Sequence, residues 1–125
     1  MGEGFIKLHR KMLEWEWYQN TNVMALFIHI LFLCNWEDKK WQGVTIKRGS
    51  FITSIDHLAK DTGLTNQETR TALDKLISTG EVNKQTTNKY TIVTVNKYND
   101  YQSVNKQITN EQQTNNKQIT TTRLS

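Results

Sequence analysis

The sequence predicts a mainly α-helical domain with a small β-hairpin, an α+β fold, followed by a polar tail. Three observations lead to this prediction. A continuous apolar run from Val23 to Cys34 has the length of a buried helix. Two further helical segments flank a glycine-containing turn at 62–65, and two alternating segments follow them. After Tyr101 the composition changes to mostly Gln, Asn, Thr and Ser.

The length and composition exclude several protein classes. With 125 residues, the chain has room for one domain of ordinary size. Its single cysteine, Cys34, excludes a disulfide scaffold and a cysteine-based zinc site, because both need several thiols. The apolar run that ends there is 12 residues long, against the roughly 20 that a bilayer span needs. We therefore expect no membrane partner, and a reduced thiol without an export signal favours the cytoplasm.

The formal net charge of +4 is unevenly distributed along the chain. Residues 1–38 hold three basic against five acidic residues, a net charge of −2. Residues 39–101 hold ten basic against six acidic residues, a net charge of +4, and the last 24 residues add +2. A basic C-terminal part beside an acidic N-terminal part favours a polyanion as the partner of one face.

The N-terminal residues predict a helix and an aromatic cluster. Apolar side chains recur at near-helical spacing from Phe5 to Leu13, which predicts a first helix that ends at about Glu14. Three aromatic residues follow it: Trp15, Trp17 and Tyr18. These tryptophans, with Trp36 and Trp41, could stack unpaired bases, although packing in a core or interface is the preferred interpretation.

A second helix, Val23–Asn35, is predicted for the apolar run, with Asn20, Thr21 and Asn22 as the turn and N-cap before it. This helix is apolar on almost every side, so we expect it at the centre of the core or shared with a second subunit. Together with the aromatic cluster, it predicts a homo-oligomer formed through the N-terminal region. Within it, His29 is interpreted as a packed core histidine and Cys34 as a packing residue.

A polar, basic stretch from Trp36 to Gln42 separates this helix from two short predicted strands. Val44 and Ile46 alternate with polar residues, and Phe51 and Thr53 flank Ile52. The two strands lie on either side of a turn at 48–50.

Two helices joined by a glycine turn are predicted next. Ser54 is a good N-cap for a helix Ile55–Thr62, which ends at Gly63. Thr65 begins the following helix, and Glu68 three residues later completes a capping box. This helix is expected to end at Gly80 and to turn three side chains inward: Leu73, Leu76 and Ile77.

A β-hairpin is predicted beyond these helices. The segments Glu81–Gln85 and Tyr90–Val95 alternate in polarity around a turn at 86–89. Two helices joined by a short turn form a helix-turn-helix, and the hairpin lies where a wing would be. The predicted fold class is therefore a winged helix-turn-helix with an N-terminal helical extension.

The second helix of this motif carries side chains suited to reading DNA bases. Asn and Gln can bind adenine with two hydrogen bonds, and Arg can bind guanine in the same way. Lysines and hydroxyls on the hairpin are phosphate donors. A solvated helix face without function is the alternative. The candidate DNA-binding residues are Thr65, Asn66, Gln67, Arg70, Thr71, Lys84, Thr87, Asn88 and Lys89, with Lys47, Arg48 and Lys60 as further phosphate contacts.

Several stretches share a family pattern: Phe5-Ile-Lys-Leu-His-Arg-Lys, Lys40-Trp-Gln-Gly, Lys47-Arg-Gly-Ser-Phe-Ile-Thr-Ser54, Leu58-Ala-Lys-Asp-Thr-Gly-Leu64 and Thr69-Arg-Thr-Ala-Leu-Asp-Lys-Leu76. Over about residues 4–101 the chain resembles the N-terminal domain of phage replisome organisers, which are related to DnaD-type primosome proteins. The resemblance implies a winged helix that binds origin DNA. A helicase loader is implied as a partner only if a C-terminal domain, absent from this sequence, exists. Thr69 departs from the family's more common aliphatic residue.

Enzymatic and metal-binding functions are not expected. His9, His29 and His57 are widely separated, and none has a second ligand four positions away. The glycines are isolated turn residues and do not form a phosphate-binding loop. The sequence therefore predicts no catalytic residue, no cofactor and no metal.

Two alternatives to origin binding use the same fold. One is a winged helix that serves as an oligomerisation and protein-interaction module, and the other is a transcriptional regulator of a mobile element. Single-stranded DNA is a further possible ligand beside duplex DNA. Residues 1–101 are predicted as the DNA-binding domain and 102–125 as a polar low-complexity linker or tail, with a marginal helix as the alternative for the tail.

Overall fold

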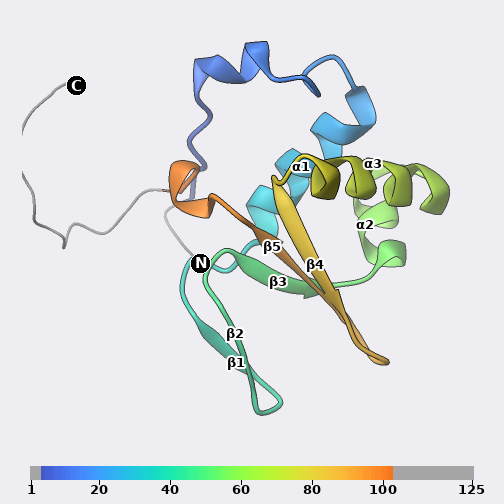
Figure 1. Cartoon of the computed structure of the whole chain (residues 1–125). Helices are drawn as coiled ribbons and strands as arrows, with labels where there is room; N and C mark the ends of the chain where they lie inside the picture. The colour runs from blue at the N-terminus through green and yellow to red at the C-terminus, as the bar shows by residue number, and fades with distance from the viewer. Residues whose placement is uncertain (1–3, 103–125) are drawn as a thin grey trace, which may run out of the picture.

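Three α-helices and two small antiparallel sheets make up residues 4–102, the part of the chain that this computed structural model describes (Figure 1). The α+β class expected from the sequence is confirmed. The helices are α1 (Thr21–Leu33), α2 (Ile55–Thr62) and α3 (Asn66–Ser78), and short 3-10 helices span Arg10–Glu14 and Tyr98–Asp100. The strands are β1 (Lys39–Trp41), β2 (Val44–Ile46), β3 (Ser50–Thr53), β4 (Val82–Thr86) and β5 (Thr91–Val95).

The first α-helix, α1, supplies the centre of the core. It begins after Asn20, whose side-chain oxygen accepts a hydrogen bond from the Val23 amide at 3.1 Å, so the predicted N-cap is confirmed. One stripe of α1 is buried, at the three- and four-residue spacing of a helix face: Val23, Leu26, Phe27, Ile30 and Leu31. The apolar residues between these positions are left outside the core.

The segments α2 and α3 start and stop where the sequence predicts. The Ser54 hydroxyl caps α2, and Gly63 ends it in the left-handed conformation, with φ of 78°. Thr65 and Glu68 form the expected capping box at the start of α3. The predicted core face of α3 is confirmed for Leu73 and Leu76, which are buried, and Ile77 packs half-buried beside them.

The larger sheet joins segments from both sides of the helix pair. Its strand order is β3-β5-β4, all antiparallel. The predicted hairpin is confirmed as β4–β5, in register from Val82 opposite Val95 to Thr86 opposite Thr91. Strand β3 precedes α2 and pairs with β5, which closes the sheet against the helices.

A second hairpin, β1–β2, was not predicted. Residues 36–42 were described from the sequence only as a polar, basic stretch, but Lys39–Trp41 pairs with Val44–Ile46. The turn between them is Gln42-Gly43, with φ of 48° and 80°, values typical of a two-residue hairpin turn. The predicted strand pair around residues 48–50 is therefore split, because β2 joins β1 whereas β3 joins the larger sheet.

The predicted N-terminal helix is wrong over most of its length. Residues 5–9 are not helical, and only Arg10–Glu14 forms a 3-10 helix. The Lys7 amide donates a hydrogen bond of 2.6 Å to the Tyr101 carbonyl, which holds this segment along the end of the domain. Its apolar residues pack against the core without forming an α-helix: Ile6 does so from a non-helical segment and Met12 from the 3-10 helix.

Trp15 and Trp17 pack within the domain, as the preferred interpretation expected. The Trp15 indole donates to the Glu81 carboxylate at 3.0 Å, and its ring lies 5.1 Å from that of Phe27. The Trp17 indole donates to the Thr79 hydroxyl at 2.9 Å. These contacts tie the segment before α1 to the end of α3 and leave both rings half-buried.

The last described residue belongs to the domain. The Gln102 side chain is buried and accepts a hydrogen bond from the Tyr98 hydroxyl at 3.0 Å, one residue beyond the predicted boundary. The rest of the predicted tail, 103–125, lies outside the described residues. Within residues 4–102, no helix has the length and apolar character needed to cross a bilayer.

Candidate nucleic-acid interface

The face of α3 opposite the core is polar and exposed. The helix packs against α1 and α2 through one stripe, made by Thr69, Ala72, Leu73 and Leu76. Several side chains on the remaining surface are exposed, and they include the candidate contacts in the N-terminal half: Asn66, Gln67, Arg70 and Thr71. The helix therefore presents its base-reading candidates to solvent together, as the sequence predicts.

Local hydrogen bonds already engage part of this set. The Thr65 hydroxyl accepts the Glu68 amide in the capping box. Asn66 donates to the Asp56 carboxylate at 2.7 Å, and Gln67 donates to the Thr71 hydroxyl at 3.3 Å. Within residues 4–102, the Arg70 side chain makes no hydrogen bond or ion pair and is the most available of the α3 candidates.

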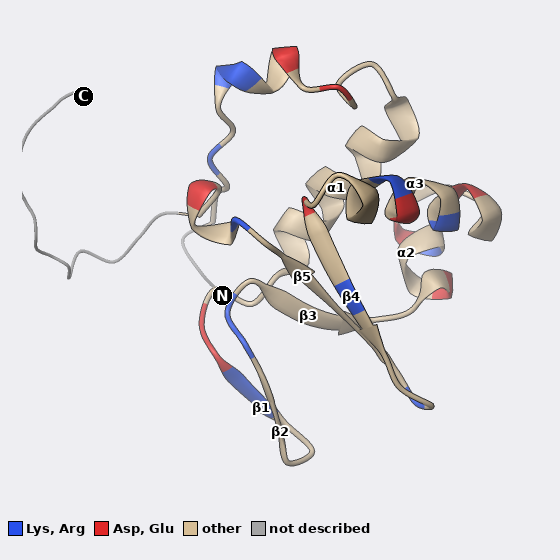
Figure 2. Ribbon diagram, viewed as in Figure 1, with Lys and Arg blue, Asp and Glu red and all other residues tan. Residues whose placement is uncertain are grey.

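The β4–β5 hairpin carries positive charge along its length and at its tip (Figure 2). Lys84 is exposed in the middle of β4, and Asn88 and Lys89 are exposed in the turn. The Thr87 hydroxyl accepts from the Lys89 amide at 3.2 Å and from the Tyr90 amide at 3.1 Å. Thr87 therefore shapes the turn, whereas Lys84 and Lys89 extend into solvent.

The three further phosphate candidates differ in availability. Lys47 and Lys60 are exposed. The Arg48 guanidinium, in contrast, donates to the Trp36 carbonyl and to the Asn99 side chain, and it lies 5.0 Å from the centre of the Tyr98 ring. Arg48 holds the loop before β3 against the 3-10 helix Tyr98–Asp100, so its guanidinium is already engaged within the domain.

Positive charge is concentrated on the two hairpins rather than on α3. Arg70 and Lys75 of α3 are balanced by Glu68 and Asp74. The β1–β2 hairpin, in contrast, carries Lys39 and Lys40 without an acidic residue of its own. Sequence reasoning missed these lysines as candidates, although Gln42-Gly43 between short alternating segments is a signal that could have revealed the hairpin.

His29 and Cys34 are held by contacts within the domain. The expectation that His29 is a core residue is wrong, because its side chain is only half-buried and its ring nitrogen is 3.1 Å from the Asp61 carboxylate on α2. Cys34 is buried, which confirms its packing role, and this burial raises the pKa of its thiol to about 12. Among the described residues, no three His, Cys, Asp or Glu side chains gather as metal ligands would.

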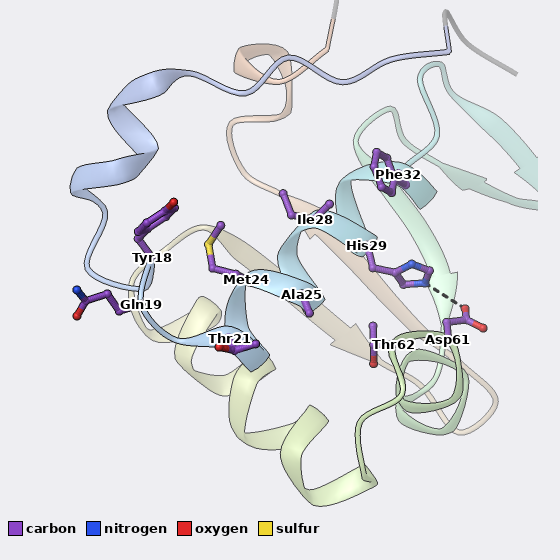
Figure 3. A pocket seen from close by; sticks show the side chains of 10 residues that line it. All are labelled: Tyr18, Gln19, Thr21, Met24, Ala25, Ile28, His29, Phe32, Asp61 and Thr62. Carbon is purple, nitrogen blue, oxygen red and sulfur yellow. Dashed lines mark hydrogen bonds and ion pairs between the residues drawn. The ribbon is translucent and has the colours of Figure 1, made fainter.

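An apolar groove of about 810 Å³ runs along the outer face of α1 (Figure 3). Its lining includes Tyr18 and the α1 residues Met24, Ala25, Ile28 and Phe32, and the His29–Asp61 pair lies at one side. Phe32 is 64% exposed. This is the outer side of the helix that the sequence showed to be apolar all round, and it is a surface distinct from α3.

Comparisons of the chain with protein-family models, with curated proteins and with solved structures give no match.

Proposed function

We propose that this chain is the winged-helix DNA-binding domain of a phage or mobile-element replication initiation protein, a replisome organiser that binds origin duplex DNA. The observation that supports it best is the polar, solvent-facing N-terminal half of α3 together with the lysine-bearing β4–β5 hairpin. The strand order supports it further, since a winged helix has one strand before its helix-turn-helix and a hairpin after it, joined in one sheet.

The proposed contacts divide by chemistry. Arg70 reads a guanine edge in the major groove, and Gln67 reads an adenine beside it. Asn66 and Thr71 make supporting contacts once their local hydrogen bonds rearrange. Lys84 and Lys89 neutralise phosphates and contribute affinity without sequence preference. Replication initiation, as distinct from DNA binding in general, rests on the family resemblance.

The test is a titration of cognate and scrambled duplex DNA, after selection of a cognate site from random duplexes. Arg70→Ala should reduce the binding free energy for the cognate duplex by about 1–3 kcal/mol and weaken discrimination against the scrambled duplex. Arg10→Ala is the matched control, because Arg10 is an exposed arginine on the 3-10 helix Arg10–Glu14, away from α3 (Figure 2). Unchanged cognate binding by Arg70→Ala would remove α3 as the reading element.

The α1 groove favours a second candidate function, homo-oligomerisation. Ala25 and Phe32 are seven residues apart and therefore lie on the same face of α1, two turns from each other. In a two-fold symmetric pair of antiparallel α1 helices, each Phe32 would cover the Ala25 position of the other copy. We propose a second copy of this chain as the occupant of the groove, so that the expected N-terminal interface consists of the outer side of α1 and Tyr18, without Trp15 and Trp17.

A further inference from the structure

The β1–β2 and β4–β5 hairpins extend from the same side of the domain (Figure 1). One aromatic contact joins them. Trp41 of β1 and Tyr90, just before β5, meet edge to face with their ring centres 5.2 Å apart. Trp41 nevertheless remains 38% exposed. An additional hairpin is therefore held against the proposed DNA-binding hairpin with part of an indole ring facing solvent.

A hollow of about 480 Å³ lies at this place. Trp41 and Lys39 form part of its wall, and they lie on the same face of β1 because alternate residues of a strand share a face. Leu33, Ile46 and Phe51 add apolar lining. The hollow thus combines an aromatic ring, an aliphatic lining and an ammonium group, the combination that accommodates a base and its phosphate.

The charge of the surrounding surface favours an anion. Lys39 and Lys40 both line the hollow and are exposed, and neither makes an ion pair within residues 4–102. Lys84 and Lys89 on the neighbouring hairpin are also exposed. Two acidic residues, Glu37 and Asp38, precede β1, and Asp38 accepts a hydrogen bond from the Arg48 amide at 2.8 Å.

We propose that the β1–β2 hairpin is a binding site for single-stranded DNA, in which one unpaired base stacks on Trp41 and the adjoining phosphates contact Lys39 and Lys40. Duplex DNA does not fit this site as well, because the faces of its bases are covered by neighbouring base pairs and cannot reach an indole ring. The inference rests on the proposal that the protein binds DNA, but it does not depend on α3 reading a sequence. A domain with both surfaces would hold duplex and unpaired DNA side by side.

The test is the binding of a fluorescein-labelled oligo(dT) of about 15 nucleotides, a length within the range covered by small single-strand-binding folds. Trp41→Ala should weaken this binding about tenfold, within the range known for loss of one base–aromatic stack. Trp41→Phe should retain most of the affinity but lose the quenching of tryptophan fluorescence that oligo(dT) causes in the unchanged protein. Duplex affinity should stay within about twofold in both variants.

A pair of double variants separates phosphate binding from net charge. Lys39→Ala/Lys40→Ala should make the slope of log K against log salt concentration for oligo(dT) shallower by about 1.4, or about 0.7 for each phosphate that is no longer neutralised. Arg10→Ala/Lys11→Ala removes the same charge from the 3-10 helix Arg10–Glu14 and should leave that dependence unchanged. Circular dichroism of Trp41→Ala shows whether removing the ring that packs on Tyr90 unfolds the hairpin. If it does, the results for Trp41→Phe and for Lys39→Ala/Lys40→Ala test the proposed site instead.

Three results would overturn the inference: no binding of oligo(dT) by the unchanged protein, wild-type quenching in Trp41→Phe, or equal effects of the two double variants on the salt dependence. These results are distinguishable from failure of the proposed function. That failure would appear as duplex binding that does not respond to Arg70→Ala or Lys89→Ala, whatever oligo(dT) does.

Discussion

The Thr69 hydroxyl donates a hydrogen bond of 2.9 Å to the Thr65 carbonyl, one turn earlier in α3. Thr69 is fully buried among the apolar residues that join α3 to the rest of the core. The same carbonyl also accepts the Thr69 amide at 2.9 Å, so the hydroxyl is satisfied without a partner from another element. This local bond explains how a polar residue occupies a fully buried position among apolar side chains.

Thr69→Val should therefore change the free energy of unfolding by less than about 1 kcal/mol, because the shape is kept and no polar group loses its only partner. Thr69→Ala should destabilise the domain by about 1–2 kcal/mol through the cavity that it leaves. Urea unfolding of the two variants measures the difference. Equal destabilisation by both would mean that the hydroxyl itself matters to the core.

Among the glycines that the structure describes, Gly49→Ala should be the most damaging substitution. Gly49 has φ of +83°, and an added Cβ would lie 2.9 Å from the Tyr98 Cβ. Gly80 has a similar φ of +85° but open space around it, so Gly80→Ala is the matched control for backbone strain alone. We expect the free energy of unfolding, measured by thermal unfolding, to fall by about 1–2 kcal/mol for Gly80→Ala and by at least about twice that for Gly49→Ala. Similar losses would show that the Tyr98 side chain moves to make room.

Lys89→Ala should weaken binding to every duplex about equally and reduce the salt slope by roughly one, because a lone ammonium neutralises phosphate without reading bases. Arg70→Ala should instead act on the cognate site. Titrations at several salt concentrations, with folding checked by circular dichroism, distinguish the two. A loss of sequence discrimination in Lys89→Ala would place the hairpin tip against base edges.

Phe32→Glu should convert the proposed homo-oligomer to a monomer, because a carboxylate would be buried in an apolar contact. Folding should survive, since Phe32 lies outside the buried stripe of α1. Leu13→Glu is the control: Leu13 is 62% exposed, similar to Phe32, but lies outside the groove. Sedimentation at tens of micromolar measures the outcome, and an unchanged protein that sediments as a monomer contradicts the proposal.

Stability should fall as pH rises from about 9 towards 12. Burial raises the pKa of the Cys34 thiol from its ordinary 9.0 to about 12, so the folded chain holds this proton more tightly than the unfolded chain. The stabilisation is complete below pH 9 and is lost through that window, by up to about 1.4 kcal/mol per pH unit. Burial also raises the pKa of Tyr98 and Tyr101, which adds to the fall at alkaline pH.

Cys34→Ala separates the thiol from these tyrosines. Urea unfolding between pH 8 and pH 11 should give a shallower decline in the variant than in the unchanged protein. Equal slopes would mean that the thiol titrates at its ordinary pKa in the folded domain. The absolute stability of the variant is not the readout, because it also loses the hydrogen bond from the thiol to the Gly49 carbonyl.

Local signals were enough to predict α2, α3 and the β4–β5 hairpin, nearly to the residue. Ser54, Gly63 and the Thr65–Glu68 capping box act on backbone groups within four positions of themselves. The exposed side of α3 could also be predicted, since helical spacing determines which side chains oppose its apolar stripe. Among the candidate DNA contacts, Gln67 and Arg70 were predicted in this way and Lys89 from its place in the hairpin turn, and their exposure in the structure agrees.

These short-range features follow from the sequence alone, because each one depends on neighbours that the chain holds together. The other features depend on tertiary contacts. These contacts pair β2 with β1 rather than with β3, engage Arg48 with Trp36 and Asn99, and pack Trp15 and Trp17 while leaving Trp41 and Phe32 exposed. These outcomes depend on which distant segments meet when the chain closes, and residues such as Trp17 and Thr79 come together across 62 positions for which no local pattern exists.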